Sequence, residues 1–373
     1  MQDAIADVPG VVAMATTATE TLYAGAAGVR ARGAAAPMTL DTVFHLASMT
    51  KAVTSVAAMQ LVEQDRLSLD APIGDVLPEL ASPKVLTGYG ADGAPLLRAA
   101  AGPVTLRQLL THSAGYGYDT WNAEIKRWNA DHGGPRLPTN WEQLRAAPLL
   151  FDPGTRWNYG INTDVVGKAV EAVSLLSLDQ YWQAHVTGPL GMIDTGVTMT
   201  AEQRTRRALV HARAADGSLS PMDMVRGEGP SFCMGGGMLC GTAPDYLRFV
   251  RMLLARGGDI LRPETVASMA RNQMGGLAML PMRSAVAERS NDVAFFPGMR
   301  KEWGLGFMIN TERAPSGRSA GSLAWAGLAN TYYWIDPARG VGGVVMMQVL
   351  PFADARCLEV LSAFETSVYG LLD

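Results

Sequence analysis

Cysteine is scarce in this chain, with three residues among 373, namely Cys233, Cys240 and Cys357. An odd number of cysteines at such wide separations excludes the disulfide framework that small secreted domains use. Their spacing also matches no zinc-binding pattern. We therefore expect three reduced thiols.

Histidine is almost as rare, and the five residues lie too far apart for a paired-histidine metal helix. They are His45, His112, His132, His185 and His211. We expect most of them to be surface or structural residues. The sequence implies no metal and no organic cofactor.

The chain also lacks a strong charge imbalance, with 31 Lys and Arg against 35 Asp and Glu and a formal net charge of -4. Because the chain also has no long basic run, we expect it not to bind nucleic acid. No stretch of about 18 uncharged apolar residues could span a membrane. Residues 1–10 lack the basic and apolar regions of a leader. We expect a cytoplasmic protein with a small-molecule substrate, either as a monomer or as a homodimer.

What the chain does contain is apolar material, 48% of its residues, and this is enough for a substantial core. Patterns typical of strands occur near both ends. The N-terminal ones predict a hairpin, and the others precede a closing helix at 353–371. The strand patterns cover residues 11–17, 21–29, 304–309, 323–326, 331–335 and 342–349.

Between these ends, residues from about 73 to 227 show short helical patterns separated by Pro and Gly. These patterns cover residues 105–112, 140–147, 162–174 and 178–186, and longer amphipathic helices follow at 243–255 and 263–272. Strands at both ends around central helices predict one antiparallel sheet flanked by helices, with an inserted helical domain. We divide the chain into an α/β domain of residues 1–72 and 228–373 and an inserted, mainly helical domain of residues 73–227. The active site would lie in the cleft between them.

The first chemical motif is Ser48-Met49-Thr50-Lys51, which opens a mostly buried helix. Positions i and i+3 share a helix face, so the Ser48 hydroxyl would lie beside the Lys51 amine. A lysine that burial or a neighbouring cation has neutralised can accept the serine proton. The positive end of the helix dipole favours the alkoxide that forms. The motif alone is weak, but its place at the start of an apolar helix strengthens it.

A competing nucleophile, Ser319, lies in the pentapeptide Gly317-Arg318-Ser319-Ala320-Gly321. A nucleophile elbow needs a buried strand before the serine and a helix after it. Residues 310–316 are polar and residues 322–325 lead into a strand. We therefore reject Ser319 as the nucleophile.

Several segments, taken in order, resemble the serine β-lactamase and penicillin-binding-protein superfamily. Residues 44–51, FHLASMTK, are similar to its first motif. Similar segments follow over nearly the whole chain, at residues 106–115, 151–159, 235–237 and 242–249. The resemblance implies a β-lactamase/transpeptidase-like fold that combines an α/β domain with an all-α domain.

By this resemblance, Tyr159 would be the second catalytic group, a phenol hydrogen-bonded between the nucleophile and Lys51. A tyrosinate beside a lysinium is plausible as a general base. The asparagine that follows two residues later in the family is Ile161 here, so the amide that binds a lactam carbonyl is missing. We place Ile161 among the substrate-binding residues. His45 and His112 could support the site from behind, but no histidine base is required.

The family's third motif, Lys-Thr-Gly, appears as Trp325-Ala326-Gly327 on a predicted strand. These three residues would contact substrate, with Gly327 allowing a close backbone approach. The backbone amides of Ser48 and Leu328 would form the oxyanion hole. An indole in place of the cation removes the group that holds a lactam carboxylate and offers an aromatic wall. Trp-x-Gly in this place resembles the family VIII carboxylesterases.

The resemblance therefore predicts a serine carboxylesterase that cleaves short-chain esters through an acyl-enzyme on Ser48, with weak β-lactam cleavage as a side activity. Three alternatives stay open. A β-lactamase or D-amino-acid peptidase would use the same nucleophile, and an acyltransferase would pass the same acyl group to an alcohol. A penicillin-recognising sensor would acylate once and stay modified. Trp121, Trp128 and Trp141 could line the alcohol side of the cleft.

Overall fold

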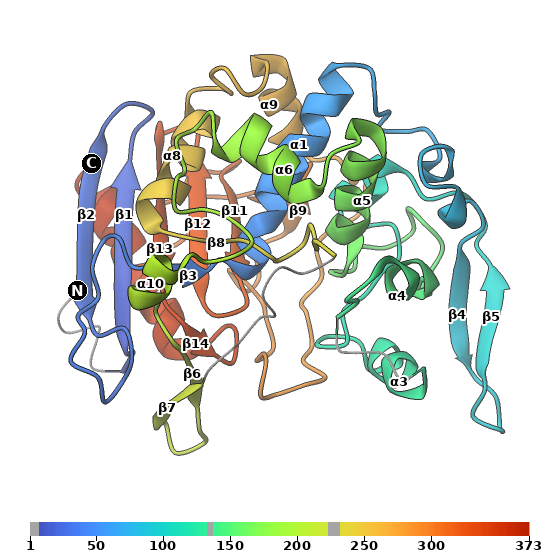
Figure 1. The fold of residues 1–373 in the computed structure, drawn as a ribbon, viewed down its shortest axis with the longest axis horizontal. Helices are drawn as coiled ribbons and strands as arrows, with labels where there is room; N and C mark the ends of the chain where they lie inside the picture. Colours follow the sequence, from blue (N-terminus) through green and yellow to red (C-terminus); the bar gives the residue numbers. More distant parts are fainter. Residues whose placement is uncertain (1–6, 133–136, 223–231, 373) are drawn as a thin grey trace.

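The two ends of the chain meet in one sheet, as the sequence predicts. The computed structural model describes residues 7–132, 137–222 and 232–372. The sheet has seven strands in the order β2-β1-β13-β12-β11-β10-β9, and every neighbouring pair is antiparallel. The strands are β1 (Gly10–Thr16), β2 (Thr21–Gly28), β9 (Lys301–Trp303), β10 (Met308–Asn310), β11 (Leu323–Gly327), β12 (Thr331–Asp336) and β13 (Val341–Met346). Figure 1 shows N-terminal strands in blue beside C-terminal strands in red.

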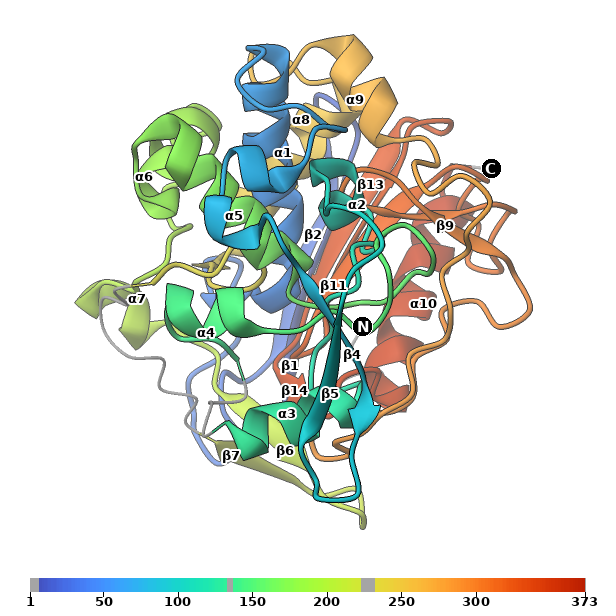
Figure 2. The same cartoon turned by 90° about the vertical axis from the view of Figure 1, so that its right-hand side faces the viewer.

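Helices cover both faces of this sheet (Figure 2). Tyr333 of β12 packs against Tyr246 of α8 (Ala243–Leu254), with ring centroids 5.2 Å apart. Its neighbour Trp334 points to the opposite face, because side chains alternate along a strand. There it meets Phe364 of α10 (Ala355–Gly370) at 5.9 Å. Trp325 is the register partner of Tyr333 and therefore lies on the α8 face.

The predicted buried helix is present as α1 (Thr50–Glu63), whose residues from Thr50 to Leu61 are all buried. A helix that is apolar on every side belongs inside a protein, and α1 lies between the sheet and the helical part of the chain (Figure 1). A short 3₁₀ turn, η2 (Ala47–Met49), precedes it. Ser48 therefore lies in this turn rather than in the first turn of the α-helix.

The predicted insertion, residues 73–227, is mainly helical where the structure describes it, as expected. It also contains strands that the sequence patterns did not reveal. Its helices are α2 (Leu106–Leu110), α3 (Ala123–Asp131), α4 (Trp141–Ala146), α5 (Asn162–Ser174), α6 (Leu178–Trp182), η5 (Gln183–Thr187) and α7 (Ala201–Thr205). Short 3₁₀ turns precede them at η3 (Ile73–Asp75) and η4 (Pro78–Leu80). Two hairpins are added, β4 (Lys84–Tyr89) with β5 (Pro95–Ala99) and β6 (Val210–Arg213) with β7 (Leu219–Met222).

The boundaries of the inserted domain at residues 73 and 227 stay predictions, and residue 227 lies outside the described residues. β6 lies within the predicted insertion, yet it pairs in parallel with β14 (Val349–Leu350) near the C-terminus. A further two-stranded sheet joins β3 (Phe44–His45) to β8 (Cys240–Gly241). The strand immediately before the nucleophile turn is thus paired with a segment that follows the insertion.

One predicted strand is only half formed, since residues 304–307 are irregular and β10 begins at Met308. Gly306 has a φ of +100°, which a regular strand does not accommodate. The predicted helix at 263–272 is also shorter, as α9 (Pro263–Met269). The three cysteines, all within the described residues, are buried and form no disulfide. Among the described residues, no helix is both long and apolar enough to cross a membrane.

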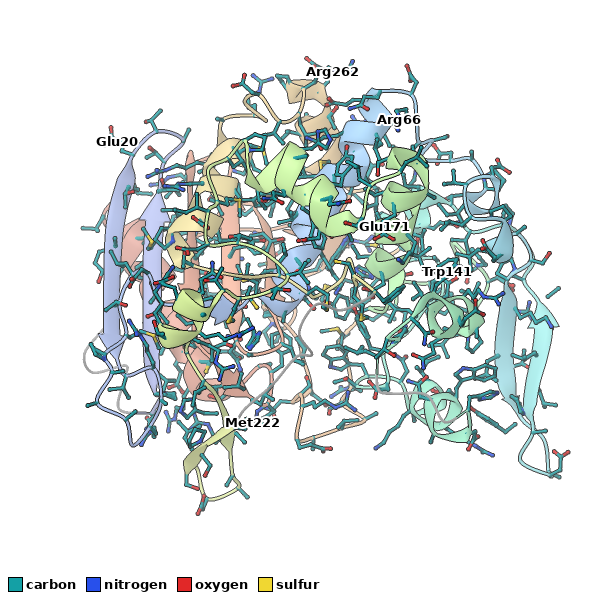
Figure 3. All side chains as sticks on the ribbon, in the orientation of Figure 1. Glu20, Arg66, Trp141, Glu171, Met222 and Arg262 are labelled. Carbon is teal, nitrogen blue, oxygen red and sulfur yellow. The ribbon has the colours of Figure 1, made fainter. Side chains whose placement is uncertain are left out.

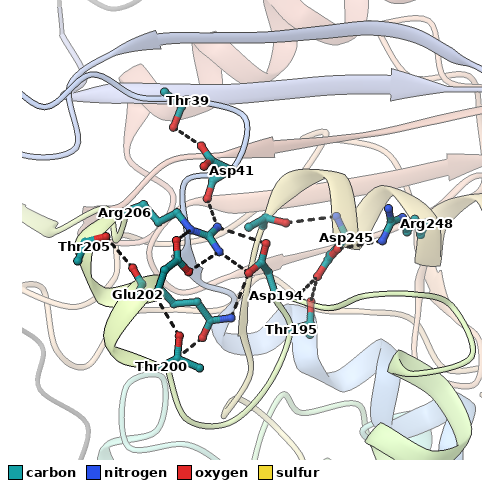
Figure 4. A network of polar contacts seen from close by, with 12 residues as sticks. Thr39, Asp41, Asp194, Thr195, Thr200, Glu202, Thr205, Arg206, Asp245 and Arg248 are labelled. Carbon is teal, nitrogen blue, oxygen red and sulfur yellow. Dashed lines mark hydrogen bonds and ion pairs between the residues drawn. The ribbon is translucent and has the colours of Figure 1, made fainter.

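The loop that leads into β3 is held by a charged network around Arg206, just after α7 (Figure 4). The Arg206 guanidinium donates to Glu202 at 2.7 Å and also to Asp194. It donates in addition to the backbone carbonyl of Asp41. This contact fixes the chain three residues before the strand that carries the nucleophile turn.

The last residue of β11, Gly327, permits the closest approach between the sheet and the nucleophile turn. A Cβ atom there would lie 2.2 Å from Thr331 Oγ1 and 2.3 Å from the carbonyl oxygen of Leu46. Both distances are far below van der Waals contact, so any side chain would push β11 away from η2.

We predict that Gly327→Ala lowers the free energy of unfolding by about 1–3 kcal/mol, the usual effect of overpacking. It should also reduce catalysis, because the displaced backbone adjoins Ser48. Thermal melting and an ester assay measure the two effects. Gly102→Ala, where an added Cβ meets nothing within 4 Å, is the control. Equal stability of the two variants would contradict the close packing of β11 against η2.

Candidate active site

Ser48 is held at the junction of β3 and α1 by a strained turn. Ala47, directly before it, has a φ of +46°, a left-handed conformation that residues with a Cβ rarely adopt. Non-glycine residues in this region cost of order 1–3 kcal/mol and persist where the surrounding structure imposes them. Ser48 itself is half-buried.

Lys51 lies one turn further along, as predicted, and its Nζ is 3.2 Å from Ser48 Oγ. The side chain is almost completely buried, with 2% exposed. Nζ also contacts the carbonyl oxygen of Gly236 at 2.8 Å and the hydroxyl of Tyr118 at 3.0 Å. The amine therefore has three oxygen partners in an environment from which water is excluded.

The glycine run at 235–237 provides the backbone that lines this amine. The carbonyl of Gly235 accepts from Thr54 Oγ1 at 2.6 Å, and the N–H of Gly236 donates to Asp164 Oδ1 at 2.7 Å. A Cβ at Gly235 would lie 2.5 Å from the Thr163 carbonyl oxygen. Only a chain without side chains fits between α1 and α5 here.

Asp164, in the first turn of α5, is fully buried behind Lys51. Burial raises the pKa of its carboxyl group to about 6, although the Lys51 charge and the Gly236 N–H oppose the shift. Burial also raises the pKa of the Tyr118 phenol, and the Asp164 charge raises it further. Tyr118 is therefore a neutral phenol at physiological pH.

Tyr159 lies in the site, but its hydroxyl is bonded differently from the expectation. Lys51 Nζ is 4.8 Å from the centroid of the Tyr159 ring. The hydroxyl accepts a hydrogen bond from Trp325 Nε1 at 3.0 Å. Among the described residues it has no hydrogen bond to Lys51 or Ser48, and the phenol in contact with Lys51 is that of Tyr118.

Trp325 forms part of an aromatic wall beside the two tyrosines. Its ring centroid is 4.7 Å from Trp303 and 6.0 Å from Phe295. Trp121 adds to the wall, 5.3 Å from the Tyr159 ring. Trp325 is buried and carries no charge, so it offers no cation to a substrate carboxylate.

The predicted oxyanion hole has a structural basis in the contact of Gly327 with Leu46. Because the Leu46 carbonyl lies against Gly327, residue 328 follows β11 next to the turn that holds Ser48. Leu328 is half-buried. The roles of the Ser48 and Leu328 amides stay predictions.

The other predicted binding residues separate into two groups. Ala326 is buried on the α10 face of β11, because it pairs with Tyr332 in the sheet register. Ile161 lines a cavity of about 310 Å³ together with Tyr118 and Trp128. Trp141, labelled in Figure 3, instead donates its indole N–H to Glu79 at 3.3 Å, among the short helices.

Two histidines lie close to these residues. His112 is buried, and its ring centroid is 4.8 Å from that of Tyr159. Burial and the Lys51 charge lower its pKa well below the ordinary value, so the ring is neutral. Its Nδ1 is 2.9 Å from the amide nitrogen of Asn162. His45 contacts Cys240 Sγ through Nδ1 at 3.3 Å, behind the nucleophile turn.

The sequence patterns did not point to Tyr118 and Asp164 as site residues. Asp164 did leave a signal, because it is a carboxylate directly before Val165 and Val166 in an apolar helix. Tyr118 left none, since residues 116–120 belong to no helix or strand. The rejected Ser319 lies in the irregular segment between β10 and β11, where its N–H donates to Asp336.

Several known proteins are similar to this chain in sequence or in fold. The Beta-lactamase family model matches residues 1–365. Lovastatin esterase of Penicillium rubens is 32% identical, over 97% of this chain and 94% of its own. Monacolin J acid methylbutanoyltransferase of Aspergillus terreus is also 32% identical, over 90% of this chain and 83% of its own.

Among solved structures, a mutant of simvastatin synthase from Aspergillus terreus matches with a TM-score of 0.87 and 30% identity. The match covers 100% of this chain and 93% of the other. With a β-lactamase/transpeptidase-like fold and a family match over nearly its full length, this chain belongs to the Beta-lactamase family.

Proposed function

We propose that this protein is a serine carboxylesterase of the family VIII type, which cleaves short-chain carboxylic esters through an acyl-enzyme on Ser48. The observation that carries the proposal is the 3.2 Å contact between Ser48 Oγ and the buried Lys51 Nζ. Trp325 in the third motif supports esters over β-lactams. The similar lovastatin esterase supports the same choice.

In the first half of the reaction, Ser48 Oγ attacks the ester carbonyl and gives its proton to Lys51. The backbone amides of Ser48 and Leu328 stabilise the oxyanion, because fixed donors in a dry site need no reorganisation. Lys51 and Tyr159 together return a proton to the departing alkoxide: the Tyr159 O–H bond breaks as its proton moves to the alkoxide, and the phenolate regains a proton from Lys51. This step needs a shift of the Tyr159 hydroxyl toward Lys51, because in the structure it contacts Trp325 Nε1 instead. The acyl group then remains on Ser48.

In the second half, a nucleophile attacks the acyl-enzyme and regenerates Ser48. Water is the acceptor in the esterase, and an alcohol is the acceptor in an acyltransferase. The transferase is a second candidate function, because a similar relative is named for methylbutanoyl transfer. Aromatic walls favour an apolar alcohol over water near the acyl group.

A cavity of about 480 Å³ with mixed polar and apolar walls lies beside Tyr159. Tyr159 lies in its wall with Trp121 and Trp157, and Leu280 and Met282 contribute from the opposite segment. Cavities of this size accommodate small organic ligands. Arg156, Arg283 and Glu124 also line it, and Arg283 is paired with Asp292, so the charges of the lining give no preference for an acidic substrate.

We predict that Ser48→Ala lowers kcat/KM for p-nitrophenyl butyrate at least about 1,000-fold, as nucleophile removal does in other serine hydrolases. Lys51→Ala and Tyr159→Phe should each cost roughly 100- to 10,000-fold, the range of general acid–base groups. Ser319→Ala, in a pentapeptide of similar appearance, is the matched control and should retain activity. Wild-type turnover by the Ser48 variant would end the proposal.

The ratio of the hydrolysis product to the alcohol-transfer product shows whether water or an alcohol is the preferred acceptor. With p-nitrophenyl butyrate and rising 1-butanol, we expect butyrate to dominate in the absence of the alcohol and butyl butyrate to increase with its concentration. Gas chromatography of both products measures the ratio. Negligible hydrolysis without alcohol would identify an acyltransferase instead of an esterase.

We further predict that nitrocefin is a poor substrate, with kcat/KM at least about 100-fold below that for p-nitrophenyl butyrate. The reason is that Trp325 cannot make the charge-assisted hydrogen bonds that a lysine offers to a carboxylate. Steady-state rates on the two chromogenic substrates give the comparison. A nitrocefin rate equal to the ester rate would favour the β-lactamase alternative, and a single stable adduct without turnover would favour the sensor.

A further inference from the structure

The contacts of Lys51 pose a problem for its role as a base. Its three oxygen partners, Ser48 Oγ, Tyr118 OH and Gly236 O, match the three N–H bonds of an ammonium group. An ammonium group has no lone pair with which to accept the Ser48 proton. The site therefore needs a group that removes one proton from Lys51 before catalysis.

Asp164 has the position and an oxygen lone pair with which to accept this proton. It is completely buried, and its Oδ1 accepts from the Gly236 N–H. Its second oxygen, Oδ2, accepts no hydrogen bond of good geometry from the described residues, although the Tyr118 phenol is close enough to interact with the carboxyl group. A buried carboxylate oxygen without a donor is unfavourable, so Oδ2 is placed to gain a proton.

Tyr118 lies between the carboxylate and the amine. Its oxygen already accepts from Lys51 Nζ at 3.0 Å, so its own proton is free to point elsewhere. A Cβ built on Gly236 would lie 2.9 Å from each Asp164 oxygen and 3.0 Å from the Tyr118 hydroxyl. Both groups thus press against the same glycine from the same side.

We propose that Tyr118 and Asp164 are positioning residues that relay a proton from Lys51 to Asp164 and so leave the amine neutral. The Nζ–H bond breaks as the proton moves to the Tyr118 oxygen. The phenolic O–H bond breaks as its proton moves to Asp164 Oδ2. Both starting and final states carry zero net charge, and no proton enters from solvent. The inference rests on the proposed function, because it explains how Lys51 activates Ser48.

The physical reason for the relay is burial. An ammonium–carboxylate pair that is removed from water loses much more hydration free energy than the neutral amine and carboxylic acid do. Burial raises the pKa of Asp164 to about 6, which is the direction that favours its protonation. Tyr118 itself stays neutral because the same burial raises its pKa.

The other titratable groups around this cluster do not replace Asp164. His112 is neutral and bonded to Asn162. Asp119, directly after Tyr118, is paired with Arg289 at 2.8 Å. Tyr159 presents its ring to Lys51 while its hydroxyl contacts Trp325. Among the described groups facing Lys51, only Asp164 is a carboxylate without a cationic side chain bonded to it.

The relay predicts the direction in which the pH dependence of the reaction shifts when Asp164 is replaced. In the wild type, one proton shared between Lys51 and Asp164 defines the active state, which forms as pH rises through the first ionisation of the pair. In Asp164→Asn, the ammonium must lose its proton to solvent. Asparagine resembles the protonated acid, and the first ionisation of a coupled pair lies at or below that of either member alone. The acid limb, which is the rise of the rate on the acidic side of the pH profile, must therefore move to higher pH in the variant.

The test is the rate at which a fluorophosphonate labels Ser48 between pH 5 and pH 10, followed by intact mass. For Asp164→Asn we expect a labelling rate roughly 100-fold below wild type at pH 6, a typical contribution of proton transfer, and recovery toward the wild-type rate at high pH. Asp164→Glu, which keeps the acid, should retain the wild-type limb. Asp245→Asn, another buried aspartate, is the control for removing such a group.

An acid limb that is unchanged in Asp164→Asn would overturn the relay, as would a loss of rate that is uniform with pH. If that variant does not fold, the labelling rate of Tyr118→Phe decides the question. Its control is Tyr116→Phe, which changes a buried tyrosine two residues away. A loss of about 10-fold or more in the first alone supports the relay, and wild-type labelling overturns it. Failure of the proposed function is distinguishable, because the wild type itself would then leave Ser48 unlabelled.

Discussion

The burial of one lysine is the constraint on which the rest of this site depends. An amine with 2% of its surface exposed must find its polar partners inside the protein, since water cannot supply them. Lys51 finds them in three different parts of the chain: the nucleophile turn, the loop at Tyr118 and the glycine run at 235–237. Folding the sheet around α1 therefore assembles the chemistry at the same time.

The glycine run illustrates how closely packing and chemistry are coupled. Gly236 donates to Asp164 through its N–H and accepts from Lys51 through its carbonyl, so one residue holds the acid and the base at a fixed separation. A side chain at that position would collide with both Asp164 oxygens. Glycine is thus required by contact with the functional groups themselves, and its backbone supplies the hydrogen bonds.

The sequence was sufficient to predict features that are set by local pattern. The sheet built from both termini, the buried helix after Ser48 and the contact of Ser48 with Lys51 all follow from periodicity and spacing. The hairpin β4–β5 was not predicted, because its adjacent residues Leu96 and Leu97 are both exposed and do not alternate with polar residues. Tyr118 escaped for a different reason, since an irregular loop has no period and only tertiary packing brings it to Lys51.

The disagreement over the two tyrosines follows from what a motif encodes. The Pro-Gly-Thr context places Tyr159 in the site, and its ring does lie over Lys51 at 4.8 Å. Its hydroxyl, however, is directed by Trp325, which replaces the cation of the lactamase motif. A lysine there would repel Lys51 and attract a substrate anion, whereas an indole N–H orients a phenol. The same substitution that removes a carboxylate-binding group therefore also redirects Tyr159 and leaves the contact with Lys51 to a second phenol.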